Sequence, residues 1–134
     1  YSGTFTPNPA LVGTWAWAVY PTPANPSEID ARINAFLKAN NGKGPDKIES
    51  PKDVIQLLEG GKVAKSKFFG GYFWSGNMLI GVNDDQALKM EVRKVGGREF
   101  LIIERGGFNG IPDSDEIVAV PKDWHCGFHV YVRQ

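Results

Sequence analysis

The chain has 134 residues and a mass of 14.7 kDa, a common size for one domain and large enough to bury a hydrophobic core. Its 15 Lys and Arg residues equal its 15 Asp and Glu residues, so no overall charge attracts nucleic acid or anionic membranes. Its single cysteine, Cys126, excludes an internal disulfide, and no apolar run is long enough to insert across a bilayer.

The N-terminal segment differs in composition from the rest of the chain. Residues 1–10 contain Gly3, Pro7 and Pro9 and are expected to form an irregular arm before one domain over residues 11–134. The sequence starts with Tyr1 rather than Met, which indicates that a leading segment was removed. A cleaved signal peptide and a trimmed tag both explain this start. We favour an exported protein and leave the compartment open.

The first regular element that the sequence predicts is a strand. Residues 11–20 are rich in Trp, Val and Tyr and end at a Pro-rich breaker, which is typical of a strand. Side chains alternate along a strand, so Trp15, Trp17 and Val19 share one face. Both tryptophans therefore point to the same side of the sheet.

Two helices are predicted next. Ser27 suits the N-cap of a helix that continues to about Ala39, because its apolar residues recur at helical spacing. A second helix is predicted to begin at Ser50–Pro51–Lys52–Asp53, where Ser caps, Pro occupies the first turn and Asp faces the helix dipole. Gly60–Gly61 ends it. Its apolar residues are Val54, Ile55, Leu57 and Leu58.

The rest of the chain is predicted to form strands. Lys67–Trp74 is aromatic and Asn77–Val82 is apolar. Ala87–Val95 and Arg98–Arg105 flank Gly96–Gly97, a two-residue turn typical of a tight hairpin. The turn sets the register of the hairpin and hence its core face. The pairs on that face are Val92 with Leu101, Met90 with Ile103, and Leu88 with Arg105.

A short strand at 117–120 and a final strand over Trp124–Arg133 complete the prediction. The final strand alternates between two sides. One side carries Trp124, Cys126, Phe128, Val130 and Val132. The other side carries His125, His129, Tyr131 and Arg133.

Both ends of this predicted domain resemble calycin β-barrels. Gly13–Thr14–Trp15 resembles the Gly-x-Trp signature that begins the first strand of lipocalins and fatty-acid-binding proteins. In those barrels a basic residue on the last strand packs across the tryptophan, and Tyr131–Val132–Arg133 would supply it here. The resemblance implies structural roles for Trp15 and Arg133. The hairpin from Leu88 to Glu104 is also similar to small bacterial lipocalin-like domains.

The predicted fold class is a β-rich α+β protein, built on an antiparallel β-barrel with two helices after the first strand. After Gly61 the remaining residues leave room for roughly six or seven strands at about 5–6 residues each. A shortened or open barrel fits this length better than a full ten-stranded one. A strongly curved sheet wrapped around the two helices is the competing fold.

Six residues are expected to line a cavity for a small hydrophobic molecule, because such pockets are mainly apolar with a few polar groups. Arg105, at the end of the hairpin core face, would bind a ligand carboxylate. The alternative is that the aromatic residues only fill the core. The predicted ligand-binding residues are Trp17, Tyr72, Trp74, Met90, Arg105 and Tyr131.

No metal site is expected in the final strand. His125 and His129 share a face but would lie about 13 Å apart at roughly 3.3 Å per residue, too far to bind one ion. Cys126 points to the other side. No cofactor is expected, with haem bound by one of these histidines as a lesser alternative.

Three functions fit these features. The first is non-enzymatic binding of a small, mostly apolar ligand in a barrel cavity. The second is a small barrel enzyme of cyclase or isomerase type, in which His129 would be the acid–base catalyst. The third is a structural or interaction module whose core is completely filled. The sequence leaves the ligand and the oligomeric state undetermined.

Overall fold

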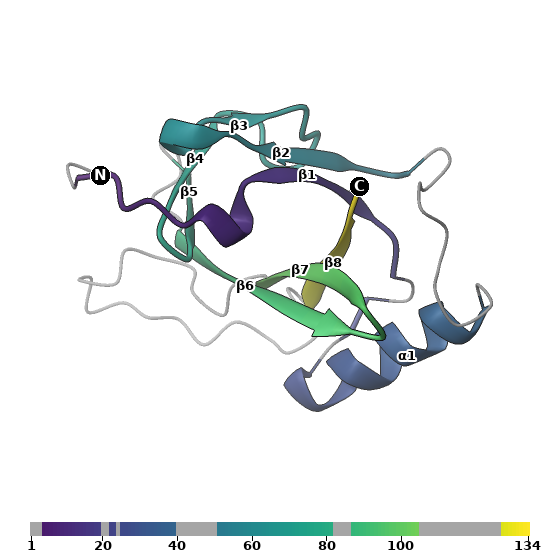
Figure 1. Cartoon of the computed structure of the whole chain (residues 1–134). Helices are drawn as coiled ribbons and strands as arrows, with labels where there is room; N and C mark the ends of the chain where they lie inside the picture. The colour runs from purple at the N-terminus through teal and green to yellow at the C-terminus, as the bar shows by residue number, and fades with distance from the viewer. Residues whose placement is uncertain (1–3, 20–21, 24, 40–50, 82–86, 105–126) are drawn as a thin grey trace, which may run out of the picture.

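A computed structural model describes residues 4–19, 22–23, 25–39, 51–81, 87–104 and 127–134. Within these residues one antiparallel sheet of eight strands curves into a nearly closed barrel, and one α-helix lies beside it (Figure 1). The predicted fold class is confirmed. The strands are β1 Gly13–Trp17, β2 Val54–Leu57, β3 Val63–Ala64, β4 Tyr72–Ser75, β5 Met78–Gly81, β6 Ala87–Val95, β7 Arg98–Glu104 and β8 Phe128–Arg133. The helical elements are η1 Pro9–Leu11, η2 Pro26–Glu28, α1 Ile29–Ala39 and η3 Glu59–Gly61.

The strand order explains how the barrel closes. The order is β3-β2-β1-β8-β7-β6-β5-β4, so the first strand lies between the second strand and the last. The two outer strands of this order are brought together by a single antiparallel bridge between Lys62 and Phe73. The sheet is therefore a shortened barrel with one weakly paired seam, as the number of residues after Gly61 suggested.

The start of β1 is fixed by three residues that meet at one end of the barrel. Trp15 is fully buried and its Nε1 donates to the carbonyl of Leu11 at 3.0 Å. The guanidinium carbon of Arg133 lies 4.1 Å from the centre of the Trp15 ring, and its Nη1 donates to the carbonyl of Val12 at 2.8 Å. Gly13 has a φ of 145°, and a Cβ there would approach Arg133 Nη1 to 2.5 Å. Only glycine leaves room for this contact.

The hairpin between β6 and β7 has the predicted register. Val92 pairs with Leu101 and Met90 pairs with Ile103 across the ladder. Gly96 and Gly97 have φ values of 61° and 80°, which a tight two-residue turn requires at both positions. The predicted partner of Leu88, Arg105, lies outside the described residues.

The predictions for the two helices have different outcomes. α1 forms within the predicted range, and its buried residues Ile29, Ile33 and Leu37 pack on the outer face of the sheet. The predicted N-cap is wrong, because Ser27 lies inside η2, whose N-cap position is Asn25. The second predicted helix is wrong, because Val54–Leu57 is strand β2. Its β-branched residues suit a strand, and pairing with β1 satisfies its backbone groups. Its alternating burial, with Ile55 and Leu57 inside, follows the period of a strand.

The sheet separates two hydrophobic cores. One fills the barrel and includes Trp15 and Tyr131, and the other lies between the outer face and α1 and includes Val130 and Val132. β8 therefore alternates as predicted, with one side of the strand in each core. The residues predicted to precede β8 in the same strand, 124–126, lie outside the described residues.

Candidate functional site

The two ends of the barrel differ in composition. Trp17, the last residue of β1, pairs with Tyr131 of β8, and its backbone N–H donates to the carbonyl of Asp53 at 3.0 Å. His129 and Tyr131 are two residues apart on β8, so their side chains lie on the same side of the strand. Both lie at the same end of the barrel as Trp17. We call this end, formed by Trp17, Asp53, Phe68, Phe69, His129 and Tyr131, the aromatic end. The opposite end, which holds η1 and Arg133, is called the capped end.

Asp53 is a buried carboxylate that connects three parts of the chain. Only 1% of its surface is exposed. Its Oδ2 accepts hydrogen bonds from the hydroxyl of Tyr131 at 2.7 Å and from Ser66 Oγ at 2.9 Å. Its Oδ1 accepts from the backbone N–H of Lys67 at 2.7 Å. These donors compensate for burial of the charge, and they hold the turn at residues 65–71 against β8.

Ser66 extends this connection to the aromatic residues of the turn. While its hydroxyl donates to Asp53, its Oγ accepts from the backbone N–H of Phe69 at 3.0 Å. The positions of Phe68 and Phe69 therefore depend on a carboxylate that lies outside their own turn. Gly70 and Gly71 follow, and the φ of 83° at Gly71 ends the turn before β4 begins at Tyr72.

Four aromatic rings surround His129, which is 2% exposed. The distances from its ring centre are 4.9 Å to Trp17, 5.7 Å to Phe68, 5.9 Å to Phe69 and 6.4 Å to Tyr131. Phe68 also meets Trp17 edge to face at 5.3 Å. Ring pairs at these separations attract one another beyond the effect of burial alone. The histidine thus belongs to an aromatic cluster at the edge of the barrel core.

Phe68 is the outermost member of this cluster. It remains 46% exposed, whereas its neighbour Phe69 is 4% exposed. Trp17 is half-buried beneath it. The aromatic end therefore presents a large apolar ring to solvent directly above a tryptophan and a histidine.

The structure brings only some of the predicted ligand-binding residues together. Trp17 and Tyr131 meet at the aromatic end, and Tyr72 reaches it through a ring contact with Phe69 at 5.4 Å. Trp74 lies near the capped end, where its Nε1 donates to the carbonyl of Leu58 at 2.9 Å. Met90 is a buried core residue, and Arg105 lies outside the described residues.

Sequence reasoning missed the two features that organise the aromatic end. Asp53 was expected at a helix N-terminus, and Phe68 and Phe69 were assigned to a strand. The run of aromatic residues followed by Gly70–Gly71 was a usable signal for a turn. No signal in the sequence indicated the hydrogen bond between Asp53 and Tyr131, because the two residues are 78 positions apart.

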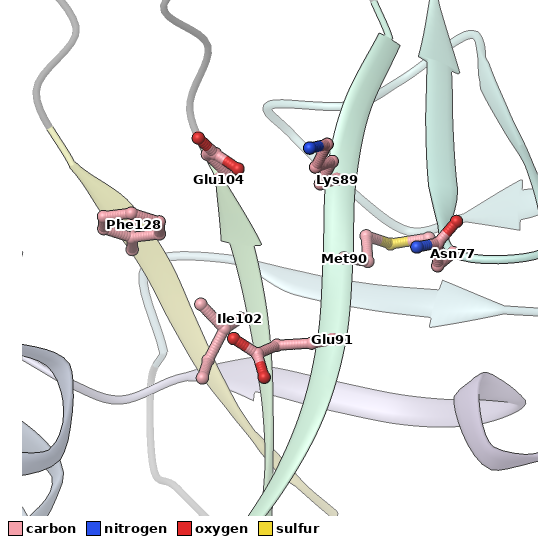
Figure 2. Close-up of a pocket in the computed structure, with 7 residues that line it drawn as sticks. All are labelled: Asn77, Lys89, Met90, Glu91, Ile102, Glu104 and Phe128. Carbon is pink, nitrogen blue, oxygen red and sulfur yellow. The ribbon is translucent and has the colours of Figure 1, made fainter. Parts of the chain in front are cut away.

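A small pocket lies on another part of the barrel (Figure 2). Its volume is about 200 Å³, below the roughly 300 Å³ at which small-molecule sites usually begin. In Figure 2 Met90 points toward Asn77, on the opposite side of β6 from Glu91. The described lining residues are Asn77, Lys89, Met90, Glu91, Ile102, Glu104 and Phe128. Its lining carries charges of both signs, from Lys89, Glu91 and Glu104, which does not suit a mostly apolar ligand.

Wider comparisons do not assign the site to a class. No protein-family profile, curated protein or solved structure matches the chain. Among the described residues, no group of three or more His, Cys, Asp or Glu is arranged to hold a metal ion. No described helix has the length and apolar composition needed to span a membrane.

Proposed function

We propose that the protein binds a small, flat, mostly apolar molecule at the aromatic end of its barrel and releases it unchanged. The exposure of Phe68 carries this proposal. Its ring is 46% exposed although it already contacts Trp17 and His129. A flat ligand laid against this ring would remove apolar surface from water and would add ring-to-ring attraction.

We further propose that the barrel is of the calycin type, as the Gly-x-Trp resemblance implies. Three contacts at the capped end support this assignment. Arg133 lies across Trp15, Gly13 leaves room for its guanidinium, and Leu11 of η1 is buried in the barrel core with Trp15. The proposed flat ligand approaches the opposite, aromatic end, where the Phe68 ring is exposed.

The hydrogen bonds of Asp53 favour binding over catalysis. An isomerase that used His129 as acid–base catalyst would benefit from a carboxylate that orients the imidazole. Among the residues that the structure describes, Asp53 is the buried carboxylate at this end, and both of its oxygens already accept hydrogen bonds from Tyr131, Ser66 and Lys67. The geometry thus commits Asp53 to holding the turn.

Tryptophan fluorescence and calorimetry test the proposal on the full chain. We would titrate it with fatty acids, haem and flat aromatic compounds such as naphthol. We expect naphthol to quench the emission of Trp17, and Phe68→Ala to weaken binding by about tenfold, the equivalent of roughly 1.4 kcal/mol. The matched control is Leu58→Ala, which removes another exposed apolar side chain, 37% exposed, away from the aromatic end.

Three outcomes would count against the proposal. Absence of binding by all three ligand classes contradicts it, and so does equal loss of affinity in Phe68→Ala and Leu58→Ala. Recovery of a chemically altered ligand, with the alteration abolished in His129→Asn, would replace binding by the cyclase or isomerase function.

A further inference from the structure

The N-terminal arm runs along the side of the barrel formed by β4 and β5 (Figure 1). The backbone N–H of Thr6 donates to Ser75 Oγ at 2.8 Å, and the N–H of Gly76 donates to the carbonyl of Thr6 at 2.8 Å. Asn8 Nδ2 donates to the carbonyl of Gly76 at 3.1 Å. Three hydrogen bonds thus fix the arm to the turn between β4 and β5.

Phe5 holds the start of this arm against the barrel. Its ring meets Trp74 edge to face at 5.2 Å. A Cβ on Gly61 would come within 3.1 Å of the Phe5 ring, so the ring lies directly against the glycine backbone. The arm is therefore attached by both apolar contacts and hydrogen bonds, and any cavity that it encloses is already formed in the free protein.

Such a cavity lies between the arm and the capped end. Its volume is about 450 Å³, within the range of roughly 300–1,000 Å³ that small-molecule sites occupy. Phe5, Pro7 and Pro9 form the wall on the arm, and Val12 and Gly60 belong to the barrel side. Because proline has a fixed φ, a wall with two prolines loses little freedom when a ligand binds.

The charge of the lining defines the ligand. Among its described residues only Glu59 is charged, and Glu59 forms no salt bridge with any described residue. The Asn8 amide group is already used to hold the arm. We propose that this cavity is a second binding site, for a small organic cation with a flat apolar body and a protonated amine that pairs with Glu59. It shares no residue with the aromatic end.

A matched set of probes tests this site. Naphthylmethylamine, naphthalenemethanol and naphthylacetate have the same apolar body and differ in charge. We expect calorimetry on the full chain to show the amine binding about fivefold more tightly than the alcohol, and the acid most weakly, as for a solvent-accessible ion pair. Glu59→Gln keeps the shape of the side chain and should make the affinities for amine and alcohol equal.

Two further variants locate the binding. Glu104→Gln removes an exposed carboxylate from another part of the barrel and should leave the preference for the amine intact. Phe68→Ala changes the aromatic end and should also leave amine binding intact. The inference is overturned if none of the probes binds, if amine and alcohol bind within twofold of each other, or if Glu59→Gln retains the preference. Loss of amine binding in Phe68→Ala would also overturn it, while supporting the ligand site at the aromatic end.

Discussion

Strand β1 carries two tryptophans on the same face, and the barrel holds them in different ways. Trp15 is fully buried, its ring nitrogen is bonded to the carbonyl of Leu11, and the Arg133 guanidinium covers its ring. Trp17 is only half-buried, and its ring contacts are to Phe68 and His129. The first tryptophan is fixed by a backbone hydrogen bond and a cation, whereas the second packs against one ring on a turn and one on β8.

This difference separates the part of the barrel that holds the fold from the part that can exchange contacts. At the capped end, Arg133 donates to two backbone carbonyls, those of Val12 and Ala10, and these directional bonds fix the start of β1. Under the proposed function, a flat ligand at the aromatic end would replace one apolar contact with another at little cost.

Trp15→Ala should destabilise the fold far more than Trp17→Ala. Removing a fully buried aromatic side chain costs about 3–5 kcal/mol, because both the burial and the packing around it are lost. Trp17 is half-buried, so its removal should cost clearly less while abolishing ligand binding. Urea unfolding followed by circular dichroism measures both losses. Equal losses in the two variants would show that the two tryptophans are not held differently.

Asp53→Ala should destabilise the protein by about 2–4 kcal/mol, because it leaves the donors of Tyr131, Ser66 and Lys67 without their buried acceptor. The turn that carries Phe68 should then loosen. Hydrogen exchange of the Lys67 backbone amide measures this directly. Asp53→Asn keeps the shape and one acceptor oxygen, so a smaller loss is expected. An unchanged exchange rate in Asp53→Ala would mean that the carboxylate does not hold the turn.

The sequence predicted the elements whose signals are local. The positive φ values that Gly96 and Gly97 supply set the hairpin register, and the strict alternation of β8 separated its two sides. The same reasoning placed α1, whose apolar residues recur at helical spacing. In each element the information lies within a few residues, so no knowledge of distant partners is needed.

The sequence did not predict β2 or the aromatic end, because their causes are distant in the chain. Ser50–Pro51–Lys52–Asp53 has the composition of a helix start, yet pairing with β1 overrides it at Val54–Leu57. Asp53 is hydrogen-bonded to Ser66 and Tyr131, which lie 13 and 78 positions away in the chain. No pattern in the sequence between these residues indicates that they will meet.

Gly13→Ala tests whether the glycine serves Arg133. The added Cβ would lie 2.5 Å from Arg133 Nη1, and the φ of 145° is unfavourable for alanine, so we expect a loss of about 1–3 kcal/mol. Arg133→Ala should relieve the steric part of this loss but not the backbone part. A double-mutant cycle with urea unfolding should give a coupling of about 1 kcal/mol. If the losses of unfolding free energy in Gly13→Ala and Arg133→Ala simply add in the double variant, the glycine is required only by its backbone φ and not by Arg133.

Phe68→Ala should have the smallest effect on stability and a large one on binding. Nearly half of the side chain is in water, at 46% exposure, so its truncation should cost less than about 1 kcal/mol. Phe69→Ala is the matched comparison, because it removes the same side chain from the next position, where only 4% is exposed, and should cost about 3–5 kcal/mol. Urea unfolding and naphthol titration on both variants separate two roles for the turn. If Phe68 serves the fold, the loss of naphthol affinity in Phe68→Ala will be in the same proportion to its loss of unfolding free energy as in Phe69→Ala. If it serves a ligand, affinity will fall while the free energy of unfolding hardly changes, as we expect for a ring that the barrel leaves uncovered.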